Sequence, residues 1–486
     1  MSAVFRLSAL ATSLALAACA VGPDYERPAS AVSARFARDE SQAMQHDAAP
    51  AGTSADADAA FWRGFGDPAL TRLIDAALAV NQDLQLAVSR YDASNALLRE
   101  TRFDRIPTIT ASGQIGHRLT SKDQAFGAPR DQRDKPTSSV GINAAWELDL
   151  FGRVRRAVEA QRAETAASAA DVRAVRIAIA GEVARAYVDL RGSQERLRIA
   201  RENADNQRQT LVLIDARVGA GRGSELDAAR ARAQVESTTS RIAVYEAAIG
   251  VDEHRLAVLT GQPPGALIGE LDAPAPLPAL VADIDPGTPG DLLRRRPDVA
   301  AAEARLHAAT ARVGVATADL FPRFTLTGLL GSMTSSYGFF RSGSDTNLIA
   351  LGVDWSFLDV GRVRARLAAS NADAAGQLAQ YRQTVLGALE ETENALLRVA
   401  RTRDETTHLE RAATDSARAA QLAHARFTAG AIDYYEVLDA ERTLLQAQDA
   451  AADGRLRSAD ATVALYKALA GGWPSGAGPD APIARR

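Results

Sequence analysis

The chain has 486 residues, a net charge of −4 and no long run of basic residues, so its charge gives no reason to expect a nucleic-acid partner. Aromatic residues make up only 5% of the chain, whereas alanine and arginine are abundant, which favours long helices over a bulky aromatic core. The six histidines are scattered and lack the spacing of a metal site. We therefore expect neither an enzyme nor a metal or other cofactor.

The N-terminus has the features of a secretion signal. Arg6 precedes the apolar stretch 7–18, which is too short to cross a membrane as a helix. The stretch ends in Leu-Ala-Ala before Cys19, the only cysteine, and this context resembles the lipobox of bacterial lipoproteins. The resemblance implies that residues 1–18 are a signal peptide and that Cys19 is diacylated. Ala20, in place of an aspartate, resembles the sorting signal for the outer membrane.

The next elements alternate between unstructured and helical patterns. Residues 19–60 are rich in Ala, Ser, Asp and Pro with little periodicity, which predicts an extended segment. From Asp67 onward the apolar residues follow helical spacing. Asn81 is a candidate start for a second helix, which runs to about Phe103 and ends before Pro107.

The period then changes to two, which predicts strands. Strands are expected at about 107–116, 139–150, 322–331 and 348–358. Nine to eleven residues with one apolar and one polar face fit a strand of a membrane barrel, although a half-buried soluble hairpin has the same pattern. Four strands cannot close a membrane barrel, because the smallest have about eight, so closure would require several chains.

The longest elements follow each second strand. No proline interrupts residues 153–218 or 362–428, and both segments carry one narrow apolar seam. About 66 residues at 1.5 Å each span roughly 100 Å, which is wider than a globular core. Such helices bury their seams by packing laterally along other helices. Glycines at 219–223 and 430 predict a reversal, after which a shorter helix returns.

These elements occur twice. Trp146 recurs as Trp355 and Gly221 as Gly430, each 209 residues later, whereas Pro107 recurs 215 residues later as Pro322. The difference of six residues is an insertion in the loop before Trp146. The predicted organisation is a first repeat, a Pro-rich linker, a second repeat and a flexible C-terminal tail, at residues 61–261, 262–290, 291–473 and 474–486.

The repeated order of helix, hairpin, very long helix and returning helix, behind a lipobox, resembles the outer membrane factors. Segments 19–28, 61–70, 81–84, 146–153 and 292–299 are similar to the most recognisable segments of the lipidated OprM/NodT-type branch of this TolC/OprM-like family.

The resemblance implies a mainly α-helical homotrimer with a 12-stranded β-barrel in the outer membrane, continuing into a 12-helix α-barrel tunnel in the periplasm. It also implies a passive exit duct for small molecules such as drugs. An inner-membrane transporter of the RND type and a periplasmic adaptor protein would be its partners, and outer-membrane lipid would hold the Cys19 anchor. Two other interpretations remain at this point: a duct for type I protein secretion, and a structural periplasmic coiled-coil lipoprotein without a pore.

Acidic residues near the reversals are candidates for a periplasmic gate. Asp227 and Glu436 each follow the reversal glycine by six residues, and Asp439 lies one turn after Glu436 on the same helix face. By resemblance, acids at these positions ring the tunnel entrance, where threefold repetition favours cations. The other interpretation is an acidic first turn that complements the helix dipole.

Four further residues at the reversals, Arg217, Gly221, Arg426 and Gly430, are by resemblance candidates for docking the adaptor. A plain requirement for glycine at a helix reversal explains the two glycines equally well. Two arginine pairs stand where strand passes into helix and either line the pore or extend to lipid headgroups: Arg153 and Arg155, Arg362 and Arg364.

Overall fold

The computed structural model describes residues 20–29, 32–37, 62, 65–278 and 286–470. The predicted signal peptide, Cys19, most of the extended N-terminal segment and the C-terminal tail lie outside the described residues. The chain divides into two compact units, each discontinuous in sequence. The first comprises Met1–Ala29, Ser89–Ala169 and Ala300–Gln383, and the second comprises Ser30–Val88, Ala170–Val299 and Thr384–Arg486.

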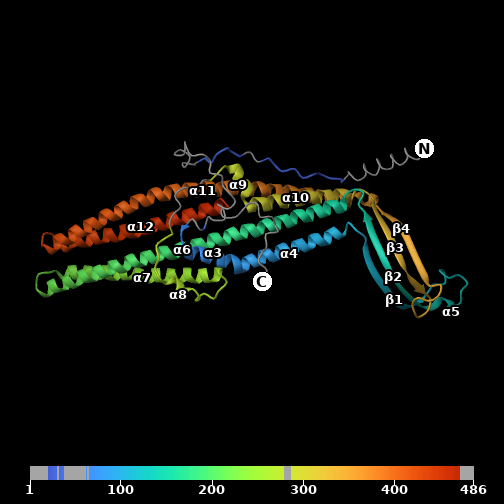
Figure 1. Cartoon of the computed structure of the whole chain (residues 1–486), viewed down its shortest axis with the longest axis horizontal. Helices are drawn as coiled ribbons and strands as arrows, with labels where there is room; N and C mark the ends of the chain where they lie inside the picture. Colours follow the sequence, from blue (N-terminus) through green and yellow to red (C-terminus); the bar gives the residue numbers. More distant parts are fainter. Residues whose placement is uncertain (1–19, 30–31, 38–61, 63–64, 279–285, 471–486) are drawn as a thin grey trace. The chain divides into compact units, whose positions relative to one another are not determined.

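The first unit combines helices with a four-stranded sheet (Figure 1). Its elements are most of α4 (Gln82–Phe103), β1 (Thr108–Leu119), α5 (Arg130–Arg133), β2 (Asp134–Leu148), the N-terminal part of α6 (Arg153–Gly219), α10 (Pro297–Ala318), β3 (Arg323–Thr334), β4 (Asp345–Asp354), the 3-10 turn η3 (Phe357–Asp359) and the N-terminal part of α11 (Val360–Thr428).

The sheet is antiparallel throughout, in the order β1-β2-β3-β4, so β2 and β3 join the two repeats and β1 and β4 are its edges. The register brings the apolar residues of all four strands to one face: Ile109, Ile115, Ile142, Trp146, Leu326, Leu330, Ile349, Leu351 and Val353. Most of these side chains are exposed, with Ile349 84% accessible. An uncovered apolar face of this extent marks a surface for lipid or protein.

Trp146 in β2 and Trp355, the residue after β4, make equivalent hydrogen bonds. Trp146 Nε1 donates to the Arg105 carbonyl at 3.1 Å, and Trp355 Nε1 donates to the Leu320 carbonyl at the same distance. The donors are 209 residues apart and the acceptors 215, which are the two offsets of the repeat. Each indole therefore ties the end of a hairpin to the turn that follows α4 or α10, the helix before that hairpin.

Residues 20–29 lie in extended conformation against the helices of the first unit. Gly22 has φ +91°, and a Cβ on it would lie 2.5 Å from Gly314 Cα, so the two backbones touch. Further along, Tyr25 stacks on His307 with ring centroids 4.4 Å apart, and Arg27 pairs with Glu303 at 2.9 Å. We call residues 20–29 the N-terminal strap.

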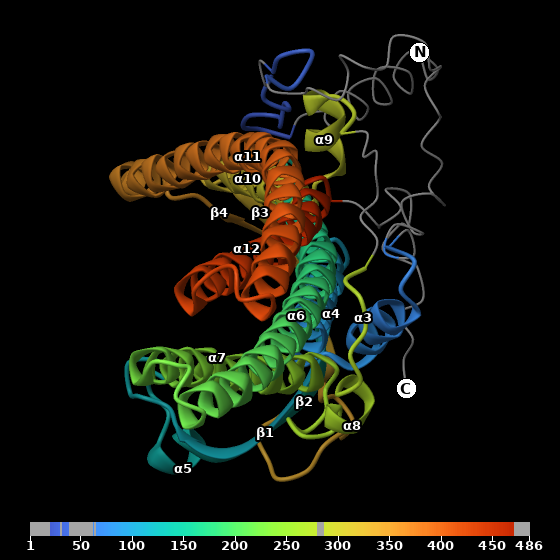
Figure 2. The same cartoon turned by 90° about the vertical axis from the view of Figure 1, so that its left-hand side faces the viewer.

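The second unit consists of paired helices with short covering elements. It contains the C-terminal parts of α6 and α11 with α3 (Pro68–Val80), α7 (Glu225–Leu259), α8 (Ile268–Leu271), α9 (Pro289–Arg295) and α12 (Tyr434–Ala468). Figure 2 shows α7 beside the C-terminal half of α6, and α12 beside that of α11. Asp67 caps α3 through its Oδ1 and accepts a hydrogen bond from the Tyr187 hydroxyl at 2.7 Å through its Oδ2.

The helix and strand bounds confirm the internal duplication. Helices α7 and α12 both have 35 residues, and α12 begins and ends 209 residues after α7. Helix α10 begins and ends 215 residues after α4, as β3 does after β1. In the described part of the chain, no helix is both long and apolar enough to cross a membrane.

Three segments differ from the expected pattern. Strand β4 runs from Asp345 to Asp354 instead of 348–358, and the 3-10 turn η3 occupies the end of the expected range. Strand β2 begins at Asp134, earlier than the alternation of apolar and polar residues indicates. Its first residues are polar and include Pro136, so they do not show the alternation, yet they pair with β1. The Pro-rich linker contains helix α8, and α9 follows directly before Arg296. Thr288 caps α9, and Pro289 occupies its first turn, where proline needs no hydrogen-bond partner.

Candidate functional site

The two helix reversals have the same backbone geometry. Gly221 has φ +69° and Gly430 has φ +74°. In the first turn the Arg222 N–H donates to the Arg217 carbonyl at 2.8 Å, and in the second the Ala431 N–H donates to the Arg426 carbonyl at 2.9 Å. This pattern is a Schellman motif, which favours glycine at the left-handed position. A Cβ on either glycine would meet nothing within 4 Å, so backbone conformation explains both glycines.

Both reversals share one small core in the second unit, which we call the tip cluster. It is formed by buried side chains from four helices: Ile214, Ala228, Ala231, Phe427, Tyr434, Val437 and Leu438. Ile432, just past the second reversal, packs against it. The α6–α7 and α11–α12 hairpins are therefore bound to each other at this end.

The two tip arginines have different surroundings. Arg217 lies with its guanidinium 4.1 Å from the centroid of the Phe427 ring and donates to the Phe427 carbonyl at 3.3 Å. Arg426 is exposed, and its guanidinium has no partner among the described residues. Arg217 therefore stabilises the contact between the hairpins, whereas Arg426 is available to another molecule.

The three candidate gate acids also differ. Asp227 lies 3.6 Å from Arg230, whose guanidinium is 5.7 Å from the Tyr435 ring centroid. Glu436 and Asp439 are exposed, and neither has a cationic partner among the described residues. Arg230 and Asp439 are equivalent positions of the repeat, 209 residues apart, with opposite charge. The first hairpin thus neutralises its acid, whereas the second presents two bare carboxylates.

The helix dipole explains only part of this acidity. Asp227 lies in the first turn of α7 and Glu436 in the first turn of α12, where carboxylates complement the positive end of the dipole. Asp439 lies beyond the first turn of α12, where the dipole contribution has faded. The presence of an acidic residue at position 439 therefore needs an explanation other than the helix dipole.

A second set of polar contacts joins the hairpins away from the tip. The Asp449 carboxylate accepts from Arg196 at 2.8 and 3.2 Å and from the Tyr245 hydroxyl at 2.8 Å, and Arg241 lies 3.7 Å away. Burial favours protonation of Asp449, but the hydrogen bonds from Arg196 and Tyr245 outweigh it and lower its pKa. One carboxylate of α12 therefore holds both α6 and α7.

Sequence reasoning missed a third contact between the helices. The His424 imidazole pairs with the Glu441 carboxylate, which also accepts from the Thr210 hydroxyl at 3.3 Å. Arg442 donates to Gln234 at 2.8 Å and so links α12 to α7. Thr210 and Gln234 are 231 and 208 residues from their partners, and only the packing of the two hairpins brings them together. His424 and Glu441 flank the reversal at Gly430, so the predicted reversal was a signal for that pair.

The arginines at the ends of the strands lie in the first unit, and three of them are paired locally. Arg153 donates to Glu147 at 2.7 Å, Arg155 pairs with Asp149 at 3.2 Å, and Arg362 pairs with Asp359 at 2.8 Å. Arg364 is exposed. The paired arginines brace the passage from strand to helix.

Comparisons with known proteins agree with this architecture. The family model described as "Outer membrane efflux protein" matches residues 73–262 and 288–471. The chain is 34% identical to outer membrane protein OprJ of Pseudomonas aeruginosa, with 97% of each chain covered. It is 33% identical to the solvent efflux pump outer membrane protein SrpC of Pseudomonas putida, with 95% of this chain and 97% of SrpC covered.

A solved structure of the outer-membrane channel OprN is also similar. The two chains share 38% identity and superpose with a TM-score of 0.86 over 94% of this chain and 100% of OprN. The expected fold class, a helical tunnel protein with a membrane β portion built by internal duplication, is confirmed, as is the outer-membrane location. The chain belongs to the outer membrane efflux protein family and is the outer-membrane channel of a tripartite efflux system.

Proposed function

We propose that three copies of the chain form a passive exit duct without enzymatic activity. One observation carries this proposal: a four-stranded sheet with two edge strands and an exposed apolar face. Unpaired strand edges and apolar surface are costly in lipid, because backbone groups there find no water. Three chains supply twelve strands, and joining β1 of one chain to β4 of the next removes every edge.

Glu436 and Asp439 form the cation-selective gate of this duct. Their support is the absence of a neutralising cation among the described residues, together with the position of Asp439 beyond the reach of the helix dipole. Threefold repetition brings six carboxylates to one opening, which attracts cations and repels anions. Asp227 contributes less, since Arg230 lies beside it.

The adaptor protein docks on the reversals. Arg426 is exposed and unpartnered among the described residues, so we assign it the main polar contact. Gly430 and Gly221 keep the turn compact, with no side chain between the two proteins. Arg217 acts indirectly by holding Phe427. The adaptor in turn connects the duct to an inner-membrane pump of the RND type.

The cargo consists of small apolar or amphipathic compounds. Several relatives are named for such cargo, including a toluene efflux pump protein and an antibiotic efflux pump protein of Pseudomonas putida, each 32% identical to this chain. These names favour the export of small molecules over the secretion of polypeptides.

Cys19 carries the lipid anchor. Its support is the strap that follows it: the Val21 N–H donates to the Phe151 carbonyl at 3.1 Å, and a Cβ on Gly152 would lie 2.7 Å from Ala20. The residue after Cys19 is thus fixed at the junction of β2 and α6. A lipid attached there enters the membrane beside the proposed barrel strands.

Planar-bilayer recordings of the purified trimer test the duct and its gate. The wild type should conduct and prefer cations, and Glu436→Gln with Asp439→Asn should reduce that preference by at least half. Asp227→Asn is the matched control and should change it little, because Arg230 already neutralises that carboxylate. A trimer without conductance would refute the duct, and unchanged selectivity in the double variant would refute the gate.

A further inference from the structure

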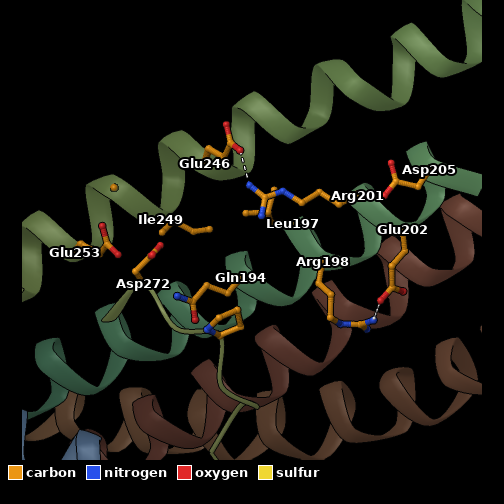
Figure 3. A pocket seen from close by; sticks show the side chains of 12 residues that line it. Gln194, Leu197, Arg198, Arg201, Glu202, Asp205, Glu246, Ile249, Glu253 and Asp272 are labelled. Carbon is orange, nitrogen blue, oxygen red and sulfur yellow. Dashed lines mark hydrogen bonds and ion pairs between the residues drawn. The ribbon is translucent and has the colours of Figure 1, made fainter. Parts of the chain in front are cut away.

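A cavity of about 470 Å³ lies in the second unit between α6 and α7, closed at one end by the segment after α8. Figure 3 shows the side chains of Glu253 and Asp272 next to each other at this end, with Gln194 near them. Leu197 and Ile249 form apolar parts of the wall. The cavity lies apart from the tip residues described above.

The segment that carries Asp272 is fixed in place. Arg191 donates to the Ala273 carbonyl at 2.9 Å, and Gln194 Nε2 donates to the Leu271 carbonyl at 2.8 Å. Arg191 and Gln194 are hydrogen-bonded to each other at 2.7 Å, and each is only 4% exposed. Two buried polar side chains thus hold the backbone on both sides of Asp272, so the cavity is preformed.

Glu253 lies in this cavity with an unsatisfied carboxylate. Its side chain is buried, with the residue 5% exposed, and its Oε1 has no hydrogen-bond partner among the described residues. Burial raises the pKa of Glu253, and the negative charge of Asp272 raises it further. A buried carboxylate without a partner costs several kcal/mol in general, which a bound cation would offset.

The arginines that line the cavity do not supply the cation that the Glu253 carboxylate lacks. Arg201 pairs with Glu246 at 2.7 Å, and Arg198 is held by Glu202 at 2.6 Å and by Glu195 at 2.8 Å. Both guanidinium groups are therefore neutralised by other acids. Arg191, next to the Asp272 segment, donates to Gln194 and to backbone carbonyls, so neither Glu253 nor Asp272 has an ion pair with an arginine of this site.

The second repeat shows that helix packing does not require an acid here. The residue 209 positions after Glu253 is Thr462, which is fully buried and donates its hydroxyl to the Ser458 carbonyl at 2.9 Å. The equivalents of Gln194 and Glu246 are Arg403 and Arg455. The second repeat therefore has a threonine with a hydrogen-bond partner at this position, whereas the first repeat has an acid with an unpartnered oxygen.

We propose that this cavity binds a small organic cation, with its ammonium group between Glu253 and Asp272 and its carbon chain against Leu197 and Ile249. The volume is large enough for an organic body, and an apolar wall with a few convergent charges is the usual composition of a small-molecule site. The site is independent of the tip and of the exported cargo.

Isothermal titration of spermidine into the detergent-purified trimer tests this proposal. Spermidine should bind saturably with one site per chain, and Glu253→Gln should raise its Kd at least tenfold. Glu236→Gln is the matched control, since Glu236 is an exposed acid on the same helix, and it should leave the Kd unchanged. Asp272 is exposed, so Asp272→Asn should not impair folding even if Glu253→Gln does. We expect Asp272→Asn to raise the Kd for spermidine at least threefold.

Three results would overturn the proposal. They are the absence of saturable spermidine binding, an unchanged Kd in both site variants, and equally tight binding of Mg²⁺ alone at the same stoichiometry. The last result would assign the carboxylates to a metal ion. Because the titration needs neither pump nor adaptor, its failure would leave the duct function untouched.

Discussion

The His424 imidazole lies 2.8 Å from the Glu441 carboxylate, and this pair joins α11 to α12 close to the tip cluster. The Glu441 side chain is only 8% exposed, so its charge depends on His424 and on the Thr210 hydroxyl for compensation. The hydrogen bond to Glu441 raises the pKa of His424 above its usual value of 6.5. The contact between α11 and α12 therefore responds to pH.

The sign of this response follows from the direction of the shift. A histidine whose pKa is raised by folding stabilises the folded state below about pH 6.5, and this contribution is lost as the pH rises through the higher folded value. We expect single-channel conductance to rise from pH 6 to pH 9 as the pair weakens. His424→Gln should flatten this dependence, whereas His408→Gln, an exposed histidine on the same helix, should leave it intact. An unchanged pH profile in His424→Gln would count against the pair as a pH-sensitive contact.

The Asp449 contacts predict a variant that opens more readily. Asp449→Ala removes the acceptor of Arg196 and Tyr245. The half-buried Arg196 then keeps one carboxylate partner, Asp453 at 3.2 Å, and its contact with the Tyr245 ring. Hydrogen bonds to charged groups contribute about 1.5–3 kcal/mol, so the hairpins should separate more often. The mean conductance of the trimer should increase severalfold. Asp415→Ala, an exposed position on α11, is the control, and equal conductance in both variants would contradict the prediction.

Three acids on α6, α7 and α12 predict a second pH effect, which has the same direction but a different physical cause. Burial, together with the negative charge of Asp189, raises the pKa values of both Asp252 and Asp460 to about 7. Acids whose pKa is higher in the folded state bind protons more tightly there, so the stability of the folded state falls as the pH rises from about 4 to about 7. Asp460→Asn should raise the melting temperature at pH 8 and change it little at pH 5. Asp373→Asn, an exposed acid, should change neither, and a lower melting temperature of Asp460→Asn at pH 8 would refute this account.

The strap predicts that Gly22 is needed for a stable first unit. Valine at this position would combine a positive φ with a clash against Gly314, because its Cβ would lie 2.5 Å from Gly314 Cα. Positive φ at a non-glycine residue costs about 1–3 kcal/mol, and the clash adds to this. Gly22→Val should release residues 20–29 to added protease, seen as cleavage by mass spectrometry. Glu26→Ala, an exposed change in the same segment, should remain as resistant as the wild type.

The sequence was sufficient for the fold class because its signals are local and repeated. Gly221 and Gly430 predicted reversals, since both turns need a positive φ, and the equal offsets of Trp146 and Trp355 aligned the two repeats. Asn81 was expected to begin a helix, and its Oδ1 accepts the N–H groups of Asp83 and Leu84. These features depend on neighbours within a few residues.

The neighbours of the candidate gate acids were harder to predict from the sequence. Arg230 follows Asp227 by three residues, a helical spacing that the sequence displays, so its neutralising role was available as a signal. The gate and docking assignments of Asp227, Glu436, Asp439, Arg217, Gly221, Arg426 and Gly430 stay predictions. Asp449 and Arg196 are more than 250 residues apart, and only the packing of two hairpins brings them together. Glu253 likewise reads as an ordinary helical acid until the Asp272 segment covers its surroundings.

The strap has a fixed length between two anchor points, Ala20 beside Gly152 and Tyr25 on His307. An extended chain advances about 3.3 Å per residue, so one inserted residue would shift the attachment point of a lipid on Cys19 by roughly that distance. The number of residues from 20 to 25 therefore fixes the distance between the helices and the attachment point of a lipid on Cys19. With the proposed lipid on Cys19, their number would set the distance between the acyl chains and the proposed barrel strands, so a change in the length of the strap should be tolerated less well than a substitution at an exposed position other than Gly22.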